Sequence, residues 1–209
     1  MWSTHLRWAA LCPTGWEIVF NGWIPAYYTT PPVVKETRKV HVQILKIVEE
    51  WFDRNSDALY IKKEEAVEYT VELQENDRYI ALVAKPDLYV LWDASNESRE
   101  MRTGAEEDYA RLVNLVVEVT SRSLVHIPRE WLTAEMLGFY IRNLRPTFTL
   151  LIQLETTTKM RIGILPLSTS ALKDLERLLS RSPKRKPTLS LCYNCDLRAV
   201  CPNPLTETT

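Results

Sequence analysis

The chain has 209 residues, 45% of them hydrophobic, so it is long and apolar enough for one sizeable domain and too apolar to be disordered. Its 26 basic and 27 acidic residues leave a net charge of −1, which gives no overall attraction to nucleic acid or to a membrane. No apolar run reaches the roughly 20 residues that cross a bilayer, and the N-terminus lacks a signal-peptide pattern. We expect a cytoplasmic protein with no membrane partner, folded as a single domain over residues 1–209.

The first half of the chain predicts two helices followed by strands. An aromatic-rich segment, residues 2–28, predicts a short helix around Cys12. From Val34 onward, apolar residues recur at separations of three and four, which predicts a long helix with one buried stripe: Val40, Ile44, Ile47, Val48, Trp51 and Phe52. Runs rich in β-formers then predict strands over 68–73, 79–84, 88–92 and 115–120, which we expect to form one sheet.

The second half predicts a helix over 130–144, a strand pair over 147–154 and 160–165, and a helix over 171–181. Ser168 to Ser170 can cap that last helix, whose predicted buried face is Leu172, Leu175, Leu178 and Leu179. A polar linker, SPKRKPTLS, leads from it to a cluster of cysteines.

The segment NLVVEVT, residues 114–120, places a carboxylate among valines. Alternation along a strand sends Val117 and Val119 to one face and Glu118 and Thr120 to the other. A buried carboxylate has to be protonated, hydrogen-bonded or bound to a cation, because an unpaired polar group costs roughly 2 to 7 kcal/mol to bury. Asp87, which follows a proline at the start of an apolar strand, raises the same question.

Glu118 and Asp87 on neighbouring strands, with His41 from the preceding helix, would form an oxygen-rich site suited to Mg²⁺ or Mn²⁺. Such a cation polarises a phosphate and activates water. Each residue also has an ordinary structural interpretation: Glu118 can be an edge residue facing water, Asp87 can shape a turn, and His41 can be a satisfied histidine on a helix flank.

Four cysteines offer a second metal site. Three of them stand in LCYNCDLRAVC, residues 191–201, and Cys12 lies far upstream. Since disulfides are rare in a reducing compartment, metal ligation is the better interpretation of Cys12, Cys192, Cys195 and Cys201. A structural zinc, an iron-sulfur cluster and idle thiols all remain open on spacing alone, because the pattern matches neither the usual zinc-finger pairs nor the common ferredoxin runs.

The succession of helix histidine, Pro-Asp at a strand start, Glu within an apolar strand and tyrosine on the next helix resembles the RecB-like branch of the PD-(D/E)XK nucleases. With Cys-x2-Cys-x5-Cys near the C-terminus and the lone Cys12, it resembles the CRISPR-associated RecB-like exonucleases that contain an iron-sulfur cluster. The resemblance implies an α/β (α+β) fold, in which helices flank a mixed central sheet. It implies a nuclease core over 34–181 and a cysteine clasp that joins 1–30 to 183–209.

Site residues follow from the same resemblance. It implies that the four cysteines hold a 4Fe-4S cluster, and that a metal ion is held by His41, Asp87, Glu118 and the backbone carbonyl of Val119. Tyr140 would be the tyrosine of the Q-x-x-x-Y helix motif. Two positions depart from the family: Thr120 stands where the lysine of Glu-x-Lys is expected, and Met136 stands where the glutamine is expected.

A lysine at position 120 would orient or deprotonate the attacking water and offset charge on the phosphate, and threonine has no charge with which to do so. Arg122 and Lys85 are the candidate replacements, and Lys85 is the better one because arginine is a poor base.

The resemblance implies a DNA exonuclease that trims ends, preferably single-stranded, for CRISPR spacer acquisition beside the integrase proteins. The alternative is a catalytically degenerate relative that acts as a DNA-binding or scaffolding subunit.

Overall fold

A computed structural model of the protein describes residues 1–2, 5–21, 32–73, 78–94, 112–120, 127–154, 159–184, 186–188, 192, 195, 197 and 201–202. The side chains of residues 32–38 and 154 lie outside this description, as does the candidate Arg122.

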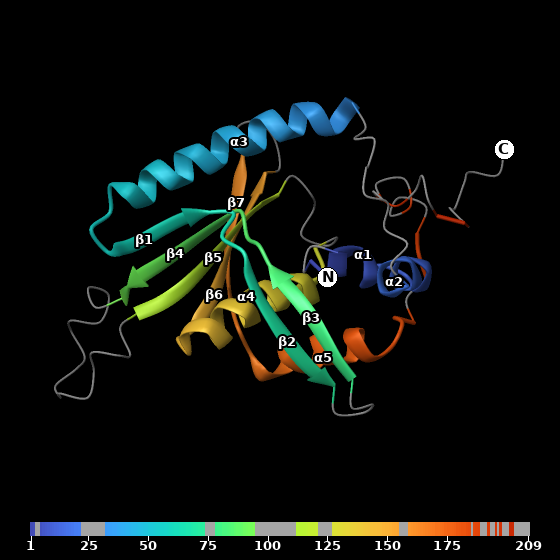
Figure 1. Ribbon diagram of the computed structural model, residues 1–209. Helices are drawn as coiled ribbons and strands as arrows, with labels where there is room; N and C mark the ends of the chain where they lie inside the picture. Colours follow the sequence, from blue (N-terminus) through green and yellow to red (C-terminus); the bar gives the residue numbers. More distant parts are fainter. Residues whose placement is uncertain are drawn as a thin grey trace.

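A five-stranded mixed sheet forms the centre of the molecule (Figure 1). Its strands run in the order β1 (Ala58–Lys63), β4 (Leu88–Asp93), β5 (Leu112–Thr120), β6 (Thr147–Leu154) and β7 (Met160–Pro166). The β5–β6 pair is parallel and the other neighbours are antiparallel. The crossover from β5 to β6 is made by helix α4 (Arg129–Asn143), as a parallel pair requires. The prediction of a mixed sheet flanked by helices is confirmed.

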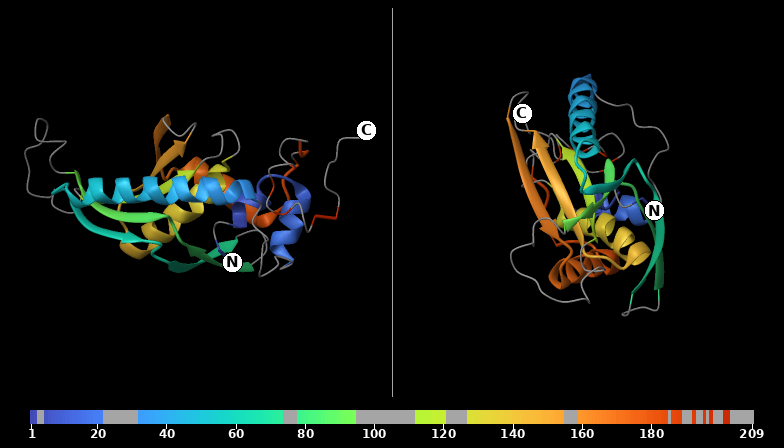
Figure 2. Two further views of the ribbon diagram at one scale, coloured as in Figure 1. Left: turned by 90° about the horizontal axis from the view of Figure 1, so that it is seen from above. Right: turned by 90° about the vertical axis from the view of Figure 1, so that its left-hand side faces the viewer.

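Helices cover the two faces of this sheet (Figure 2). Helix α3 (Pro32–Asp53) lies across one face, where its Phe52 packs with the strand residues Leu88, Val90, Val117, Val119 and Ile152. Helices α4 and α5 (Thr169–Ser180) lie on the other face, where Val116 and Leu151 join the larger core. The alternation predicted along β5 is confirmed, because Val117 and Val119 belong to one core and Val116 to the other.

The strands β2 (Val67–Leu73) and β3 (Arg78–Ala84) form a separate antiparallel hairpin. The expectation that all the early strands belong to one sheet was therefore wrong. The reason is long-range pairing: β1, which the sequence did not reveal, pairs with β4 and excludes the hairpin from the sheet. The hairpin instead packs on α4, where Tyr69 donates its phenol hydrogen bond to the carbonyl oxygen of Ala134 at 2.6 Å.

Two short helices, α1 (Leu6–Ala9) and α2 (Pro13–Phe20), lie beside the described residues of the C-terminal segment. The indole N–H of Trp16 on α2 donates to the carbonyl oxygen of Leu178 on α5 at 2.7 Å. Leu6 and Ala9 of α1 are completely buried in the larger core. The N-terminal helices are thus fixed to the sheet domain as well as to the cysteine-bearing tail. None of the described helices combines the length and apolarity needed to cross a membrane.

Candidate functional site

Asp87 lies immediately before β4, at the edge where β4 begins and β5 ends. Its Oδ2 accepts a hydrogen bond from the backbone N–H of Val119 at 2.8 Å, and its Oδ1 lies 3.3 Å from Nε2 of His41 on α3. The side chains of His41 and Asp87 are 31% and 24% exposed, so both are within reach of solvent. The predicted association of His41 and Asp87 with β5 is present in the structure.

Glu118 lies next to this pair but on the α4 face of the sheet. The residue is 4% exposed, and its Oε1 atom has no hydrogen-bond partner among the described residues. Burial raises the pKa of the Glu118 carboxyl well above its ordinary value, and the negative charges of Asp87 and Glu135 raise it further, while Arg7 lowers it. The carboxyl is therefore a buried acceptor that a proton or a cation has to neutralise.

Glu135 is a third acid at this site, and the sequence analysis missed it. It is fully buried on α4, and its Oε1 accepts a hydrogen bond from the indole N–H of Trp131 at 3.2 Å. The available signal was helical spacing, since Trp131, Glu135 and Phe139 follow one another at intervals of four along one helix face. That face meets the sheet, where Phe139 stacks on Tyr89 of β4 with ring centroids 4.4 Å apart.

The other predicted catalytic residues are Tyr140, Lys85 and Thr120. Tyr140 is 41% exposed and lies on the solvent side of α4, while Met136 is buried in the core. Lys85 lies 2.7 Å from Oε2 of Glu64 and 5.9 Å from the ring centroid of Trp2, so its ammonium group is paired with a carboxylate other than Glu118. Thr120 ends β5 and is paired in register with Gln153 of β6. The predicted roles of Tyr140, Lys85 and Thr120 stay predictions.

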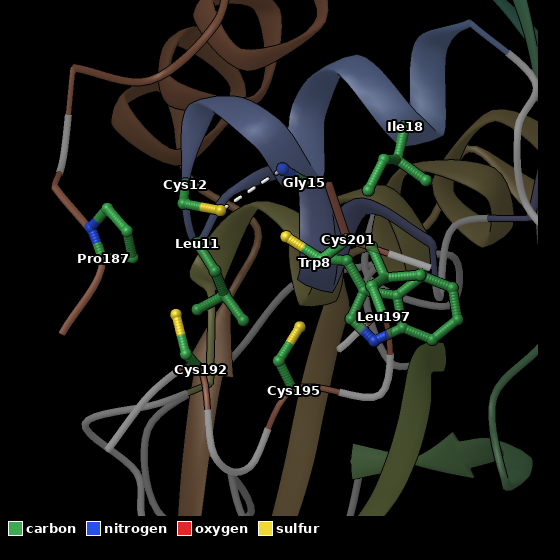
Figure 3. A pocket seen from close by; sticks show the side chains of 10 residues that line it. All are labelled: Trp8, Leu11, Cys12, Gly15, Ile18, Pro187, Cys192, Cys195, Leu197 and Cys201. Atoms are coloured by element: carbon green, nitrogen blue, oxygen red, sulfur yellow. Dashed lines mark hydrogen bonds between the residues drawn. The ribbon is translucent and has the colours of Figure 1, made fainter. Parts of the chain in front are cut away.

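The four cysteines line one pocket, although Cys12 is remote in sequence from the other three (Figure 3). Cys12 caps α2 through its Sγ, which accepts a hydrogen bond from the N–H of Gly15 at 3.3 Å. Cys192 and Cys195 are joined by a backbone hydrogen bond of 3.3 Å in which the N–H of Cys195 donates. The predicted meeting of the N-terminal and C-terminal cysteines is therefore present.

The walls of this pocket are apolar, and they include Trp8, Leu11, Ile18 and Leu197. Burial raises the pKa of the Cys12 thiol, and the neighbouring Cys201 and Cys192 raise it as well. Four partly exposed thiols in an apolar pocket match the donor set of an iron-sulfur cluster and also that of a structural zinc. Within the described ranges, no three His, Cys, Asp or Glu side chains are arranged to hold a metal ion.

Comparison with known proteins gives matches in structure alone. No protein-family model matches the chain, and no curated protein matches it significantly. The crystal structure of SSO0001 matches with a TM-score of 0.55 at 13% identity, covering 99% of this chain and 87% of that one.

A second crystal structure, named "Putative exonuclease" and from Eubacterium rectale, matches with a TM-score of 0.44 at 10% identity, covering 100% of this chain and 90% of that one. The second score is too low to support an argument. The chain therefore shares the fold of SSO0001 over nearly its whole length.

Proposed function

We propose that the protein is a divalent-metal-dependent DNA exonuclease of the CRISPR-associated RecB-like type, with an iron-sulfur cluster in its cysteine pocket. It trims DNA ends, preferably single-stranded, for spacer acquisition beside the CRISPR integrase proteins. The observation that carries the proposal is the hydrogen bond between Asp87 and Val119, which joins the start of β4 to the strand that carries the buried Glu118.

The residues that would hold Mg²⁺ or Mn²⁺ are His41, Asp87, Glu118 and the carbonyl oxygen of Val119. When bound, the cation polarises a phosphate and lowers the pKa of a water molecule that attacks it. Asp87 has one oxygen 3.3 Å from Nε2 of His41 and uses the other for the N–H of Val119, so the oxygen that faces His41 is the one that would hold the cation. Glu118 Oε1 is buried and has no hydrogen-bond partner among the described residues, as expected of an oxygen that would bind a cation.

The cysteine pocket has a structural role in this proposal. Cys12 starts α2, and the other three cysteines belong to the C-terminal segment, so a shared cluster closes a loop of nearly the whole chain. Such a closure removes conformational entropy from the unfolded chain and so stabilises the folded one. It would also keep α1 and α2 in place against the sheet domain.

Thr120 supports the rival function, a catalytically degenerate subunit that binds DNA or acts as a scaffold. A threonine hydroxyl carries no positive charge, and loss of one electrostatic group of this kind commonly lowers the rate by about 10² to 10³. Incubation of the purified protein and the Thr120→Lys variant with end-labelled single-stranded DNA and Mn²⁺ separates the two functions. Cleavage by the parent supports the exonuclease, whereas an inert parent with an active Thr120→Lys variant supports the degenerate subunit.

A further inference from the structure

The hairpin of β2 and β3 has one covered edge and one open edge. On the β3 side, the backbone N–H of Val83 donates to the carbonyl oxygen of Met1 at 2.9 Å, and Trp2 forms a parallel bridge with Val83. On the β2 side, no further strand is paired within the part of the chain that the structure describes. A strand edge without a neighbour presents backbone donors and acceptors with which another chain can pair.

The register of the hairpin shows which residues form this open edge. Because the N–H of Val83 points away from β2, the alternation of an antiparallel ladder directs the backbone groups of Leu82 toward β2, where its partner is Tyr69. The backbone groups of Glu68 and Thr70, on either side of Tyr69, therefore point outward. Both residues are exposed, so these groups are accessible to a binding partner.

A groove lies beside the same edge, where the hairpin meets α4 (Figure 1). Its walls are residues 65–69 of the chain and Gly138, Ile141 and Arg142 of α4, and its cavity volume is about 430 Å³. A Cβ on Gly138 would stand 3.0 Å from the ring of Tyr69, so the helix and the hairpin touch there and the groove opens next to the contact. Ile141 is 44% exposed and gives the groove an apolar wall. A space of this size accommodates small apolar side chains.

Glu65 provides an unused acceptor at this groove. Its side chain is 8% exposed, and its Oε1 accepts a hydrogen bond from the guanidinium of Arg142. Its Oε2 has no hydrogen-bond partner among the described residues. A buried acceptor without a donor is unfavourable, so an N–H group that enters the groove would stabilise it. Because the Arg142 side chain is 45% exposed, it can shift and open the carboxyl to such a donor.

The open edge is acidic. The side chains of Glu68, Thr70 and Glu72 are exposed on one face of β2, and Glu72 accepts a hydrogen bond from the phenol of Tyr79 at 3.1 Å. Neither Glu68 nor Glu72 forms an ion pair with another described residue. Two uncompensated carboxylates repel the phosphates of a nucleic acid and attract lysine or arginine. The charge therefore favours a basic polypeptide as the occupant of this edge.

We propose that the outer edge of β2 binds an extended, basic segment of a partner protein, which adds to the hairpin as an antiparallel strand. Its backbone pairs with that of Glu68 and Thr70, and its lysines or arginines lie opposite Glu68 and Glu72. Alternate side chains of the segment are apolar and enter the groove against Ile141, because neighbouring side chains of a strand point to opposite faces. No ligand of the candidate metal site or of the cysteine pocket takes part, so the inference is independent of the proposed nuclease.

The first test measures charge. The probe is a short fluorescein-labelled peptide in which lysine and valine alternate, with both termini blocked, and its dissociation constant for the full chain is measured by fluorescence anisotropy at physiological ionic strength. Glu68→Lys is expected to weaken binding by about tenfold or more, because attraction becomes repulsion. Asp53→Lys is the matched control and should bind as the parent does, since Asp53 is an exposed acid at the end of α3, on the other face of the sheet. Equal melting temperatures show that both variants are folded.

The second test measures backbone pairing and uses the parent protein alone. In an antiparallel pair the residues opposite Glu68 and Thr70 exchange hydrogen bonds with them, and the lysines occupy the position opposite Glu68. N-methylation of the lysine residues should therefore weaken binding by about tenfold or more, whereas N-methylation of the valine residues should have little effect. The unmethylated peptide should also slow hydrogen exchange at the amides of Glu68 and Thr70.

The inference is overturned if the parent does not bind the peptide, or if Glu68→Lys binds it as tightly as the parent does. Equal binding of the two methylated peptides, or unchanged exchange at Glu68 and Thr70, overturns it as well. Slower exchange at these amides with a single-stranded oligonucleotide and not with the peptide would show a nucleic-acid site instead. Self-association of the parent that Glu68→Lys abolishes would show that a second copy of the chain occupies the edge. Each of these outcomes leaves the proposed nuclease untouched, because none of them measures cleavage.

Discussion

The Asp87 carboxylate accepts a hydrogen bond from the backbone N–H of Val119 at 2.8 Å, which ties the residue before β4 to the residue after Glu118. Without this bond the Asp87 side chain could adopt other rotamers. The bond holds Asp87 beside β5. The other carboxylate oxygen of Asp87 faces His41, and Glu118 is buried on the α4 side of the same strand.

Glu118→Gln should stabilise the metal-free protein above pH 4.5 while it abolishes cleavage. The folded-state pKa of Glu118 is raised from 4.5, so the unfolded chain loses its proton first as the pH rises. The parent's free energy of unfolding therefore falls, relative to the variant's, above the unfolded-state pKa. We expect a gain of about 1 to 3 kcal/mol at pH 8, shrinking toward pH 4, because glutamine is neutral at every pH.

Urea unfolding with a chelator present, at pH 5 and pH 8, measures this difference. Asp174→Asn is a suitable control, because Asp174 is an exposed acid paired with Arg177 within α5. A Glu118→Gln variant that is less stable than the parent at pH 8 would show that Glu118 is ionised and favourably paired in the metal-free protein.

Gly15→Ala should disrupt the cysteine pocket, while Gly163→Ala should have little effect. A Cβ on Gly15 would stand 2.4 Å from the backbone oxygen of Trp8, so one of the two helices has to move. At Gly163, on strand β7, a Cβ would meet nothing within 4 Å. We expect Gly15→Ala to lower stability by about 1 to 3 kcal/mol, the usual cost of overpacking, and to reduce the bound metal.

Thermal unfolding and metal analysis of the two glycine variants test this. Equal melting temperatures and equal metal content in Gly15→Ala and the parent would mean that α1 and α2 separate at no cost.

Anaerobically purified protein should contain roughly four iron atoms per chain, as expected of a 4Fe-4S cluster. The reason is the donor set, four cysteines that line one apolar pocket. Serine at any one of the four positions should lower the melting temperature as well as the iron content, because the metal closes a loop of nearly the whole chain. A colourless preparation with one zinc and no iron would contradict the cluster and favour a structural zinc.

Most elements could be predicted from the sequence because their periodicity was unambiguous. The predicted boundaries of β6, β7, α4 and α5 agree with the observed ones to within about two residues, which is the usual uncertainty of such boundaries. Strand β1 was missed because it is largely exposed and carries lysines, so it shows neither an alternating nor an apolar pattern. Strand β1 pairs with β4, although β2 and β3 lie between them in the sequence. Local sequence patterns do not predict such a long-range pairing.

The candidate site was predicted only in part, for a similar reason. Asp87 and Glu118 stood out because acids are unusual in apolar strands. Glu135 has a signal in its helical spacing, but the position expected for the family's glutamine is that of Met136, one residue further along the helix.

The most direct test of the proposed nuclease compares the parent with Asp87→Asn on end-labelled single-stranded DNA in Mn²⁺. Asparagine keeps an oxygen that can accept the Val119 hydrogen bond but removes the charge that holds the cation. We predict progressive shortening of the DNA by the parent, and a rate at least about 10² lower for the folded variant. Equal cleavage by the two proteins would contradict the metal site, and cleavage by neither would contradict the nuclease.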